Sequence, residues 1–173
     1  QTNYTKNFTP MNMGPVTDPV WKKTILKYLS KKNYVIDYGC GVGFFCRIFD
    51  PKKYLGLEVN KNFIKRAKKI NKNYNFFELN NKKLTINKKR VDAIFINNVL
   101  HHMSDHQISK ALKFLKKNSK KKTKFLIIEP LLPDDFFSLQ FFLKALDIGN
   151  YMRTKIQYLK VIEKEVIVKG SYA

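Results

Sequence analysis

A short apolar segment that ends in an acidic residue and three alternating glycines constrains the fold of this chain more than any other feature. It runs Val35-Ile36-Asp37-Tyr38-Gly39-Cys40-Gly41-Val42-Gly43. The apolar run predicts a buried strand. Glycine permits positive φ and lets a backbone approach a ligand closely, and a helical pattern begins at Phe44. A strand, a glycine turn and a helix form the nucleotide-binding corner of an α/β sheet.

Short apolar segments alternate with helical patterns over most of the chain. We expect strands at 34–38, 54–58, 74–79, 93–96, 125–128 and 165–169, and helices at 18–30, 44–49, 62–70, 105–117 and 136–146. The expected strands are apolar on both sides and are separated by helices, which is typical of a parallel sheet covered on both faces. The sequence therefore predicts an α/β fold with a mostly parallel sheet.

The chain of 173 residues has the size of one domain, and we expect residues 1–173 to form a single one. No apolar run approaches the roughly 20 residues of a membrane helix, and the N-terminus lacks the pattern of a signal sequence. We therefore expect a cytoplasmic protein without a membrane span. Cys40 and Cys46 are expected to be reduced thiols, in preference to a disulfide or a metal site, and no metal is expected.

The formal net charge of +21 raises the question of a nucleic-acid partner. The cations are almost all lysine, and the arginines are Arg47, Arg66, Arg90 and Arg153. Phosphate and base recognition favour arginine. Together with abundant Asn, Ile, Phe and Tyr, the lysines are better explained by the compositional drift of an AT-rich genome. A selected basic surface is the second interpretation, and in either case the charge attracts polyanions at low salt.

Polar residues follow each of the first five predicted strands. They are Asp37 and Gly39, then Glu58, then Asn80 and Asn81, then Asn97, Asn98, His101 and His102, and finally Glu129. Ligands bind beyond the carboxyl ends of the strands in an open parallel sheet. Glu58 lies nineteen residues after Gly39, a separation at which a carboxylate can accept both hydroxyls of a ribose. The sequence therefore predicts a ligand site at this edge of the sheet.

The glycines fall at the first, third and fifth positions, whereas a dinucleotide fold prefers the first, third and sixth. With Asp37 two residues before the first glycine, the pattern resembles motif I of the class I S-adenosylmethionine (SAM)-dependent methyltransferases. The resemblance covers about residues 30–133. It includes three further segments: Leu57-Glu58-Val59-Asn60, the run from Val91-Asp92-Ala93-Ile94 to Val99-Leu100-His101-His102-Met103, and Leu126-Ile127-Ile128-Glu129-Pro130. The second and third of these segments are similar to the small-molecule branch of the family.

The resemblance implies a Rossmann-like three-layer α/β/α sandwich with six to seven strands, SAM as the cofactor and S-adenosylhomocysteine as the product. It also implies roles for the matching residues. The first motif, Asp37, Gly39, Cys40, Gly41 and Gly43, would bind the cofactor, with the methionine part against Asp37, Gly39 and Gly41. Glu58 would hold the ribose, and Val59 and Asn80 would contact the adenine. Asn97 would lie near the methionine end by its backbone.

Methyl transfer is an in-line displacement whose leaving group needs no acid, so positioning of the acceptor carries much of the catalysis. A general base is needed only for a protonated nucleophile. His101 and His102 are the nearest candidates, because imidazole titrates near neutral pH. The alternative is that one of them packs structurally under the ligand. Glu129 is a weaker candidate base, and His106 is expected at the surface.

The two ends of the chain are expected to shape the acceptor side. Residues 1–17, with Tyr4 and Phe8, form either a lid over cofactor and substrate or an arm packed on the core. Residues 134–173 form an acceptor-side segment, in which Arg153 either pairs with an acidic substrate group or lies on the surface after a helix cap at Gly149. Six strands are found where the family usually has seven, so either the native chain continues past Ala173 or the sheet is short.

The sequence predicts a SAM-dependent methyltransferase that acts on a small-molecule or lipid-like acceptor through oxygen, nitrogen or carbon. An RNA methyltransferase is the alternative that the charge suggests. A SAM-binding protein without catalysis is a third possibility, from another class. The oligomeric state is not predicted.

Overall fold

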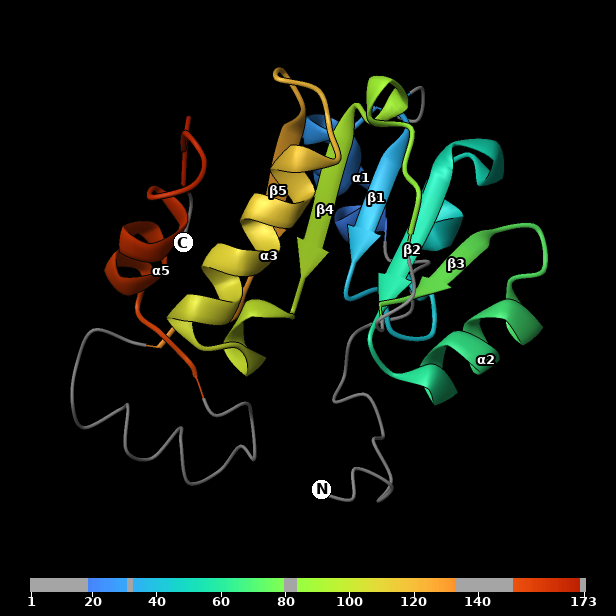
Figure 1. Ribbon diagram of the computed structural model, residues 1–173, viewed down its shortest axis with the longest axis horizontal. Helices are drawn as coiled ribbons and strands as arrows, with labels where there is room; N and C mark the ends of the chain where they lie inside the picture. The colour runs from blue at the N-terminus through green and yellow to red at the C-terminus, as the bar shows by residue number, and fades with distance from the viewer. Residues whose placement is uncertain (1–18, 31–32, 80–83, 133–150, 172–173) are drawn as a thin grey trace.

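The computed structural model describes residues 19–30, 33–79, 84–132 and 151–171. They form a five-stranded sheet with helices on both faces (Figure 1). The strands are β1 (Val35–Tyr38), β2 (Tyr54–Glu58), β3 (Asn75–Glu78), β4 (Ala93–Asn97) and β5 (Lys124–Ile128). The α-helices are α1 (Pro19–Tyr28), α2 (Lys61–Ile70), α3 (Asp105–Lys117) and α5 (Lys155–Ile162), and short 3-10 helices lie at η1 (Cys46–Ile48), η2 (Pro51–Lys53), η3 (Lys88–Arg90) and η4 (Leu100–His102). None of the helices in these ranges is both long and apolar enough to cross a membrane.

The sheet has the strand order β3-β2-β1-β4-β5, and each of these pairings is parallel. The chain runs outward from β1 to β3 and then crosses to the other side of β1 to form β4 and β5. This reversal places a topological switch point between β1 and β4, at the carboxyl ends of the strands, where ligands bind in folds of this type. Val35 pairs with Tyr54 on one side and with Ala93 on the other, so the three central strands are in register.

Alternate residues of the central strands point to opposite faces of the sheet, and each face is covered by an apolar core. Val35, Ala93 and Phe95 belong to one core together with Ile25 of α1 and Leu29, which follows α1. The other core contains buried residues of α3 and α5, and its sheet members are Ile36, Leu57, Ile94 and Ile96. Figure 1 shows α1 behind the sheet and α3 in front of it. The predicted three-layer α/β/α sandwich is therefore confirmed.

Five of the six predicted strands are present, with ends within one residue of those expected. The sixth, at 165–169, is wrong, because these residues form a turn and an irregular segment after α5. Val166 and Val168 pack against the core that contains α5, which explains their alternating pattern without a sheet partner. In the described part of the chain the sheet has five strands, fewer than the six to seven expected.

The helices follow local capping chemistry. In α3 the Ser104 side chain accepts the Gln107 N–H while the Gln107 side chain accepts the Ser104 N–H, and this capping box explains why the predicted bounds 105–117 are confirmed. The predicted helix at 44–49 is instead a turn followed by η1. The expected helix at 136–146 and the arm at 1–17 lie outside the described residues.

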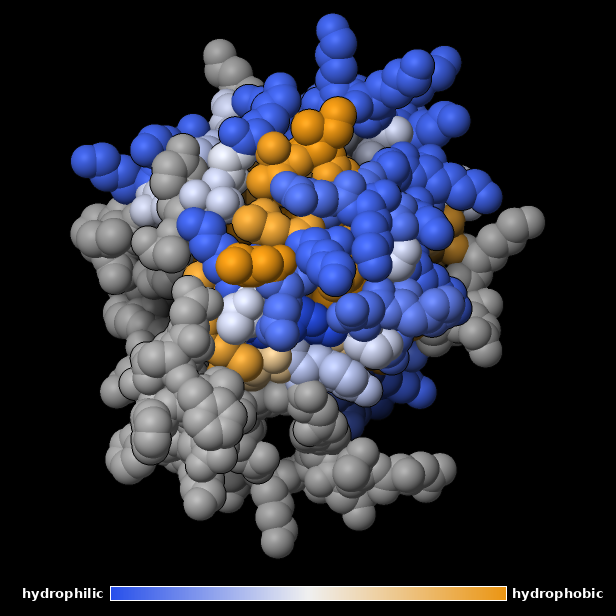
Figure 2. Space-filling view, turned by 90° about the vertical axis from the view of Figure 1, so that its left-hand side faces the viewer, coloured by the Kyte–Doolittle hydropathy of each residue, from blue (hydrophilic) through white to orange (hydrophobic). Residues whose placement is uncertain are grey.

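Hydrophilic side chains cover most of the face that carries α5, and they crowd the end of the molecule where the strands begin (Figure 2). Apolar side chains are also exposed on the described surface, among them Ile156 of α5 and Ile167 in the segment that follows it. The two cysteines, Cys40 and Cys46, are both buried and free, and burial raises the pKa of each thiol.

Candidate functional site

The glycine turn after β1 has a backbone that other residues could not adopt without strain. Gly39, Gly41 and Gly43 have φ values of 75°, 54° and 78°. A Cβ on Gly39 would lie 2.4 Å from a methyl carbon of Val99, and one on Gly43 would lie 2.6 Å from the Phe76 ring. A Cβ on Gly41 would meet no atom of the described residues within 4 Å. Gly39 and Gly43 are therefore required by packing, whereas Gly41 presents its backbone to open space.

Asp37 lies at the centre of the sheet and is 3% exposed. The Tyr54 hydroxyl donates a hydrogen bond of 2.6 Å to its carboxylate. Burial raises the pKa of Asp37 to about 7; the hydrogen bond from Tyr54 opposes this rise and the nearby charge of Glu58 adds to it. The Tyr54 hydroxyl thus fixes one oxygen of the buried Asp37 side chain.

Glu58, at the end of β2, joins the glycine turn to the start of α2. One carboxylate oxygen accepts the Gly41 N–H at 3.0 Å, and the other accepts the N–H groups of Val59 at 2.7 Å and Asn60 at 2.9 Å. Asn60 in turn caps α2 through the Asn62 and Phe63 N–H groups. The oxygen that holds Gly41 keeps room for a second donor, since a carboxylate oxygen can accept two hydrogen bonds. Val59 beside it is 68% exposed.

Glu129, which follows β5, binds the segment that leaves β4. One of its oxygens accepts the Val99 and Leu100 N–H groups, both at 2.8 Å. The other accepts the His101 N–H at 3.3 Å and contacts Nδ1 of the His101 ring at 2.8 Å. The Glu129 side chain is 4% exposed. A buried carboxylate that already accepts three backbone N–H groups and contacts a histidine ring is poorly suited to the role of free base, so the structure gives Glu129 a positioning role instead.

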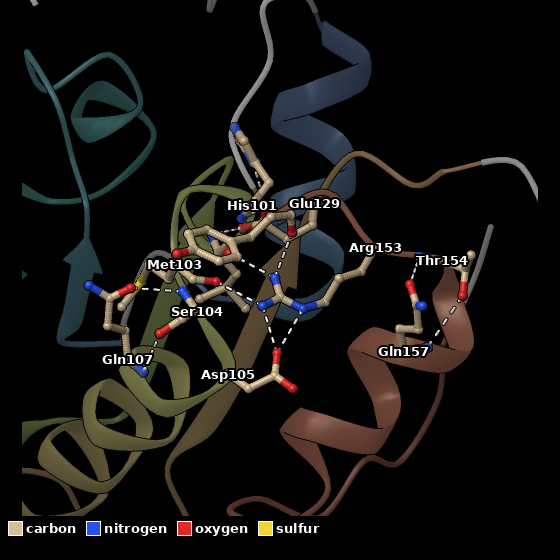
Figure 3. A network of polar contacts seen from close by, with 11 residues as sticks. His101, Met103, Ser104, Asp105, Gln107, Glu129, Arg153, Thr154 and Gln157 are labelled. Atoms are coloured by element: carbon tan, nitrogen blue, oxygen red, sulfur yellow. Dashed lines mark hydrogen bonds and ion pairs between the residues drawn. The ribbon is translucent and has the colours of Figure 1, made fainter. Parts of the chain in front are cut away.

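The two neighbouring histidines are placed very differently. His101 is 5% exposed and its ring contacts Glu129, as Figure 3 shows, whereas His102 is exposed. The ring centroids lie 4.0 Å apart. Partial burial, followed by the neighbouring His101, lowers the pKa of His102, and Glu129 opposes this effect. His102 therefore presents a neutral imidazole at physiological pH, as a proton acceptor must. His106 is exposed on α3, as predicted.

Arg153 holds the same segment from its carbonyl side. Its guanidinium donates to the carbonyl oxygens of Leu100, Tyr151 and Met103 and twice to one Asp105 oxygen, at 3.1 and 2.7 Å (Figure 3). The residue is 7% exposed. Both sequence-based expectations for Arg153 are therefore wrong, because it neither lies on the surface nor has a free donor for an acidic substrate. The partner carboxylate lies 48 residues away along the chain, so local sequence patterns could not reveal it.

Asn97 ends β4 next to this segment. Its side-chain oxygen is buried and has no hydrogen-bond partner among the described residues. A buried polar atom of this kind is usually satisfied by a ligand or water. Asn98 follows with a positive φ of 55°, which turns the chain toward η4. Asn80, expected to contact adenine, lies outside the described residues.

A cavity of about 560 Å³ lies beside Arg153, between the start of α3 and α5. It is lined by Asp105, Tyr151, Met152, Arg153, Gln157, Lys160, Val161 and Lys164. Neither the glycine turn nor Glu58 contributes to it. The candidate cofactor site is defined instead by the open face of Gly41, the Glu58 carboxylate and the end of β4.

A parallel sheet of this order, with a glycine turn after its first strand and a carboxylate after the second, defines a Rossmann-like domain that binds a nucleoside cofactor. A family model described as "Methyltransferase domain" matches residues 18–162. The chain belongs to this family. A search of curated protein sequences found no match.

Solved structures share the fold, and two of the three described next are methyltransferases by name. A SAM-dependent methyltransferase from Aquifex aeolicus has a TM-score of 0.64 at 21% identity, with 87% of this chain and 81% of that chain covered. Human N-acetylserotonin methyltransferase, solved in complex with SAM, has a TM-score of 0.65 at 16% identity, with 89% and 49% covered. The YcgJ protein of Bacillus subtilis has a TM-score of 0.64 at 19% identity, with 84% of this chain and 65% of that chain covered. This chain thus spans 65% of YcgJ and about half of the human enzyme.

The chain therefore contains a methyltransferase domain, and the cofactor that the sequence resemblance implies is SAM. The residues at the carboxyl edge fit this molecule. Gly41 leaves space where a ligand can approach the backbone, Glu58 keeps acceptor capacity for a hydroxyl, and the unpartnered oxygen of Asn97 can accept an N–H group such as the ammonium of SAM.

Proposed function

We propose that this protein transfers the methyl group of SAM to a small-molecule or lipid-like acceptor, with His102 as the base. The exposed His102 imidazole, held at the end of β4 with a lowered pKa, is the observation that carries the proposal. Bound SAM supplies the methyl group on a positively charged sulfur. His102 would take the proton of an O–H or N–H acceptor as its nucleophilic atom reacts.

The other residues of this edge would bind and orient. Glu58 would hold the ribose through the oxygen that also accepts the Gly41 N–H. Asp37 and the turn of Gly39, Cys40, Gly41 and Gly43 would enclose the methionine part, and Asn97 would accept its ammonium group. Val59, which is 68% exposed, offers an apolar surface to the adenine. Asn80 remains a prediction for the adenine contact.

The charge around this edge supports a small acceptor over RNA. Carboxylates gather there: Glu58 and Glu78 end β2 and β3, Asp105 begins α3, and Glu129 follows β5. These negative charges attract a cationic cofactor and repel a phosphodiester backbone. The loops rich in lysine lie at the opposite edge of the sheet, where the strands begin.

The test is transfer from labelled SAM to a metabolite and lipid extract, with cellular RNA assayed in parallel. Labelled product should appear in the metabolite and lipid extract and not in the RNA. His102→Gln should lower kcat about 100-fold, while the SAM affinity measured by calorimetry stays within a factor of two. His106→Gln is the matched control, because it removes an exposed histidine of α3 that has no proposed role in the reaction. Label in RNA would establish the alternative acceptor, and SAM binding without product in any fraction would establish a non-catalytic protein.

A further inference from the structure

The edge of the sheet opposite the cofactor corner carries a row of cations. Because the strands are parallel, all of them begin at this edge, and three of the loops that enter them are basic. The loops are η2 (Pro51–Lys53) before β2, η3 (Lys88–Arg90) before β4, and residues 120–124 before and at the start of β5. We call these three loops the amino-edge row. Figure 2 shows the hydrophilic side chains that extend from this end of the molecule.

Strand register makes the row nearly linear. Tyr54, Val35, Ala93 and Lys124 pair in sequence across β2, β1, β4 and β5, so the residues that precede them lie along one line. Neighbouring strands are about 4.8 Å apart, and the row therefore spans roughly 15 Å. In its middle, the Arg90 guanidinium lies 5.3 Å from the centroid of the Tyr34 ring.

The row has little negative charge of its own. Asp50 and Asp92 are its neighbouring carboxylates among the described residues; Asp50 accepts the Lys52 N–H, and Asp92 accepts the Tyr34 N–H and pairs with Lys120 at 2.5 Å. The side chains of Lys89 and Lys122 are exposed and form no ion pair with a described residue. The opposite edge carries Asp37, Glu58, Glu78 and Glu129, so the two edges of one sheet differ in charge.

We propose that the amino-edge row is a docking surface for single-stranded RNA, bound through its phosphates and without sequence preference. Lysine ammonium groups act as point charges on phosphate and do not read base edges in the bidentate manner of arginine. The large apolar side chains exposed in the described residues are Val59, Phe63, Ile70, Tyr151, Ile156 and Ile167, and none belongs to the three loops. A linear row of charge without apolar groups to insert suits a linear polyanion better than a bilayer.

RNA docked on this row is not the methyl acceptor. A strand of four or five residues is about 15 Å long, so the sheet itself separates the row from His102. The inference therefore stands independently of the acceptor proposed above. The length of the row limits the RNA to about three to five phosphate contacts. This number predicts a slope of roughly −2 to −4 when the logarithm of the RNA association constant is plotted against the logarithm of the salt concentration.

The test measures binding of fluorescent oligouridylate by anisotropy between about 50 and 200 mM salt. In the triple variant Lys52→Glu/Lys89→Glu/Lys122→Glu, one cation of each loop is reversed. The RNA affinity should fall at least tenfold and the salt slope should flatten by about 2. The SAM affinity and the melting temperature should stay as in the wild type, which shows that the variant is folded.

The matched control is Lys110→Glu/Lys160→Glu/Lys164→Glu, which reverses three exposed lysines of α3 and of the region at and after α5 and gives the same net charge. Its RNA affinity should fall much less. An equal loss in both variants would show a general effect of net charge and overturn the proposal. Tighter binding of the wild type to phosphatidylglycerol vesicles than to RNA, lost in the amino-edge variant, would assign the row to a membrane surface and also overturn it.

Discussion

Glu129 and Arg153 hold one turn from opposite sides. The Glu129 carboxylate accepts the N–H groups of Val99, Leu100 and His101, and the Arg153 guanidinium donates to the carbonyl groups of Leu100 and Met103. His102 belongs to this turn. The position of the proposed base therefore depends on two buried charged residues that have no direct role in the reaction.

Glu129→Gln is expected to disturb both the turn and the basicity of His102. The amide retains one acceptor oxygen, so buried N–H groups lose their partner at a cost of about 1–3 kcal/mol in stability. Because the negative charge of Glu129 raises the pKa of His102, its removal should move the acidic limb of the kcat profile to lower pH. The measurements are thermal unfolding and kcat against pH. An unchanged pH limb would contradict the electrostatic role.

Arg153→Lys separates the effect of the position of the His102 turn from the effect of the positive charge at residue 153. Lysine keeps the positive charge but cannot make the five contacts of the guanidinium, so stability and kcat should fall together. The acidic limb of the pH profile should remain in place, since Arg153 is not among the groups that shift the pKa of His102. If the acidic limb moves in Arg153→Lys as it does in Glu129→Gln, then displacement of the His102 ring, and not loss of the Glu129 charge, explains the pH profiles of both variants.

Glu58→Gln tests the ribose assignment. Calorimetry should show at least roughly a tenfold loss of SAM affinity, or about 1.4 kcal/mol, because the amide offers one acceptor oxygen in place of two. Glu58→Ala should show at least the same loss, with an added loss of stability from the unpaired N–H groups of Gly41, Val59 and Asn60. Glu163→Gln, which changes an exposed carboxylate after α5 by the same charge, is the control. Equal SAM affinity in wild type and Glu58→Gln would refute the assignment.

Gly39→Ala and Gly41→Ala form a matched pair with opposite expected effects. At Gly39 the new Cβ would lie 2.4 Å from Val99, and the φ of 75° adds strain, so a loss of several kcal/mol in stability is expected. At Gly41 the new Cβ would meet no atom of the described part of the chain within 4 Å, so the left-handed backbone alone costs about 1 kcal/mol. The Cβ of Gly41→Ala would instead occupy space proposed for SAM, and its affinity should fall. Unfolding curves and calorimetry on both variants distinguish the two effects.

Asp37 makes stability depend on pH in an unusual direction. Its pKa is about 7 in the folded protein and about 3.9 when unfolded, so the folded state binds the extra proton between these values. Stability should therefore fall as pH rises from about 4 to about 7, by at most about 1.4 kcal/mol per pH unit. The lowered pKa of His102 acts in the opposite direction. The difference between wild type and Asp37→Asn, measured by urea unfolding at pH 5 and pH 8, isolates the contribution of Asp37. A difference that does not change with pH would show that Asp37 is already ionised.

The sheet and its glycine corner could be predicted because their causes are local. Apolar runs followed by glycine or polar residues located β1 to β5, and the amphipathic pattern of residues 105–117 located α3. Thr154 and Gln157 form a capping box in α5, a signal in the sequence from which this helix could have been predicted. At 165–169 a run of apolar residues suggested a strand, but Val166 and Val168 pack against the core while Ile167 is exposed.

The contacts that organise the site depend on residues far apart in the chain. Glu129 reaches His101 across 28 residues, and Arg153 reaches Asp105 across 48. Neither pairing leaves a periodic pattern, since each depends on how β5 and the segment before α5 lie against the end of β4. The sequence could therefore predict His101 and His102 together as candidate bases, but only the structure distinguishes the buried ring of His101 from the exposed ring of His102.

The opposite charges at the two edges of the sheet give the molecule a permanent electric dipole parallel to its strands. Close to the carboxyl edge the carboxylates favour a cationic group, while a negatively charged surface or strand attracts the other end. A protein bound through the amino-edge row would consequently be oriented, with its catalytic edge facing solution. An immobilised polyanion would then display the enzyme without blocking the entry of SAM or of the acceptor.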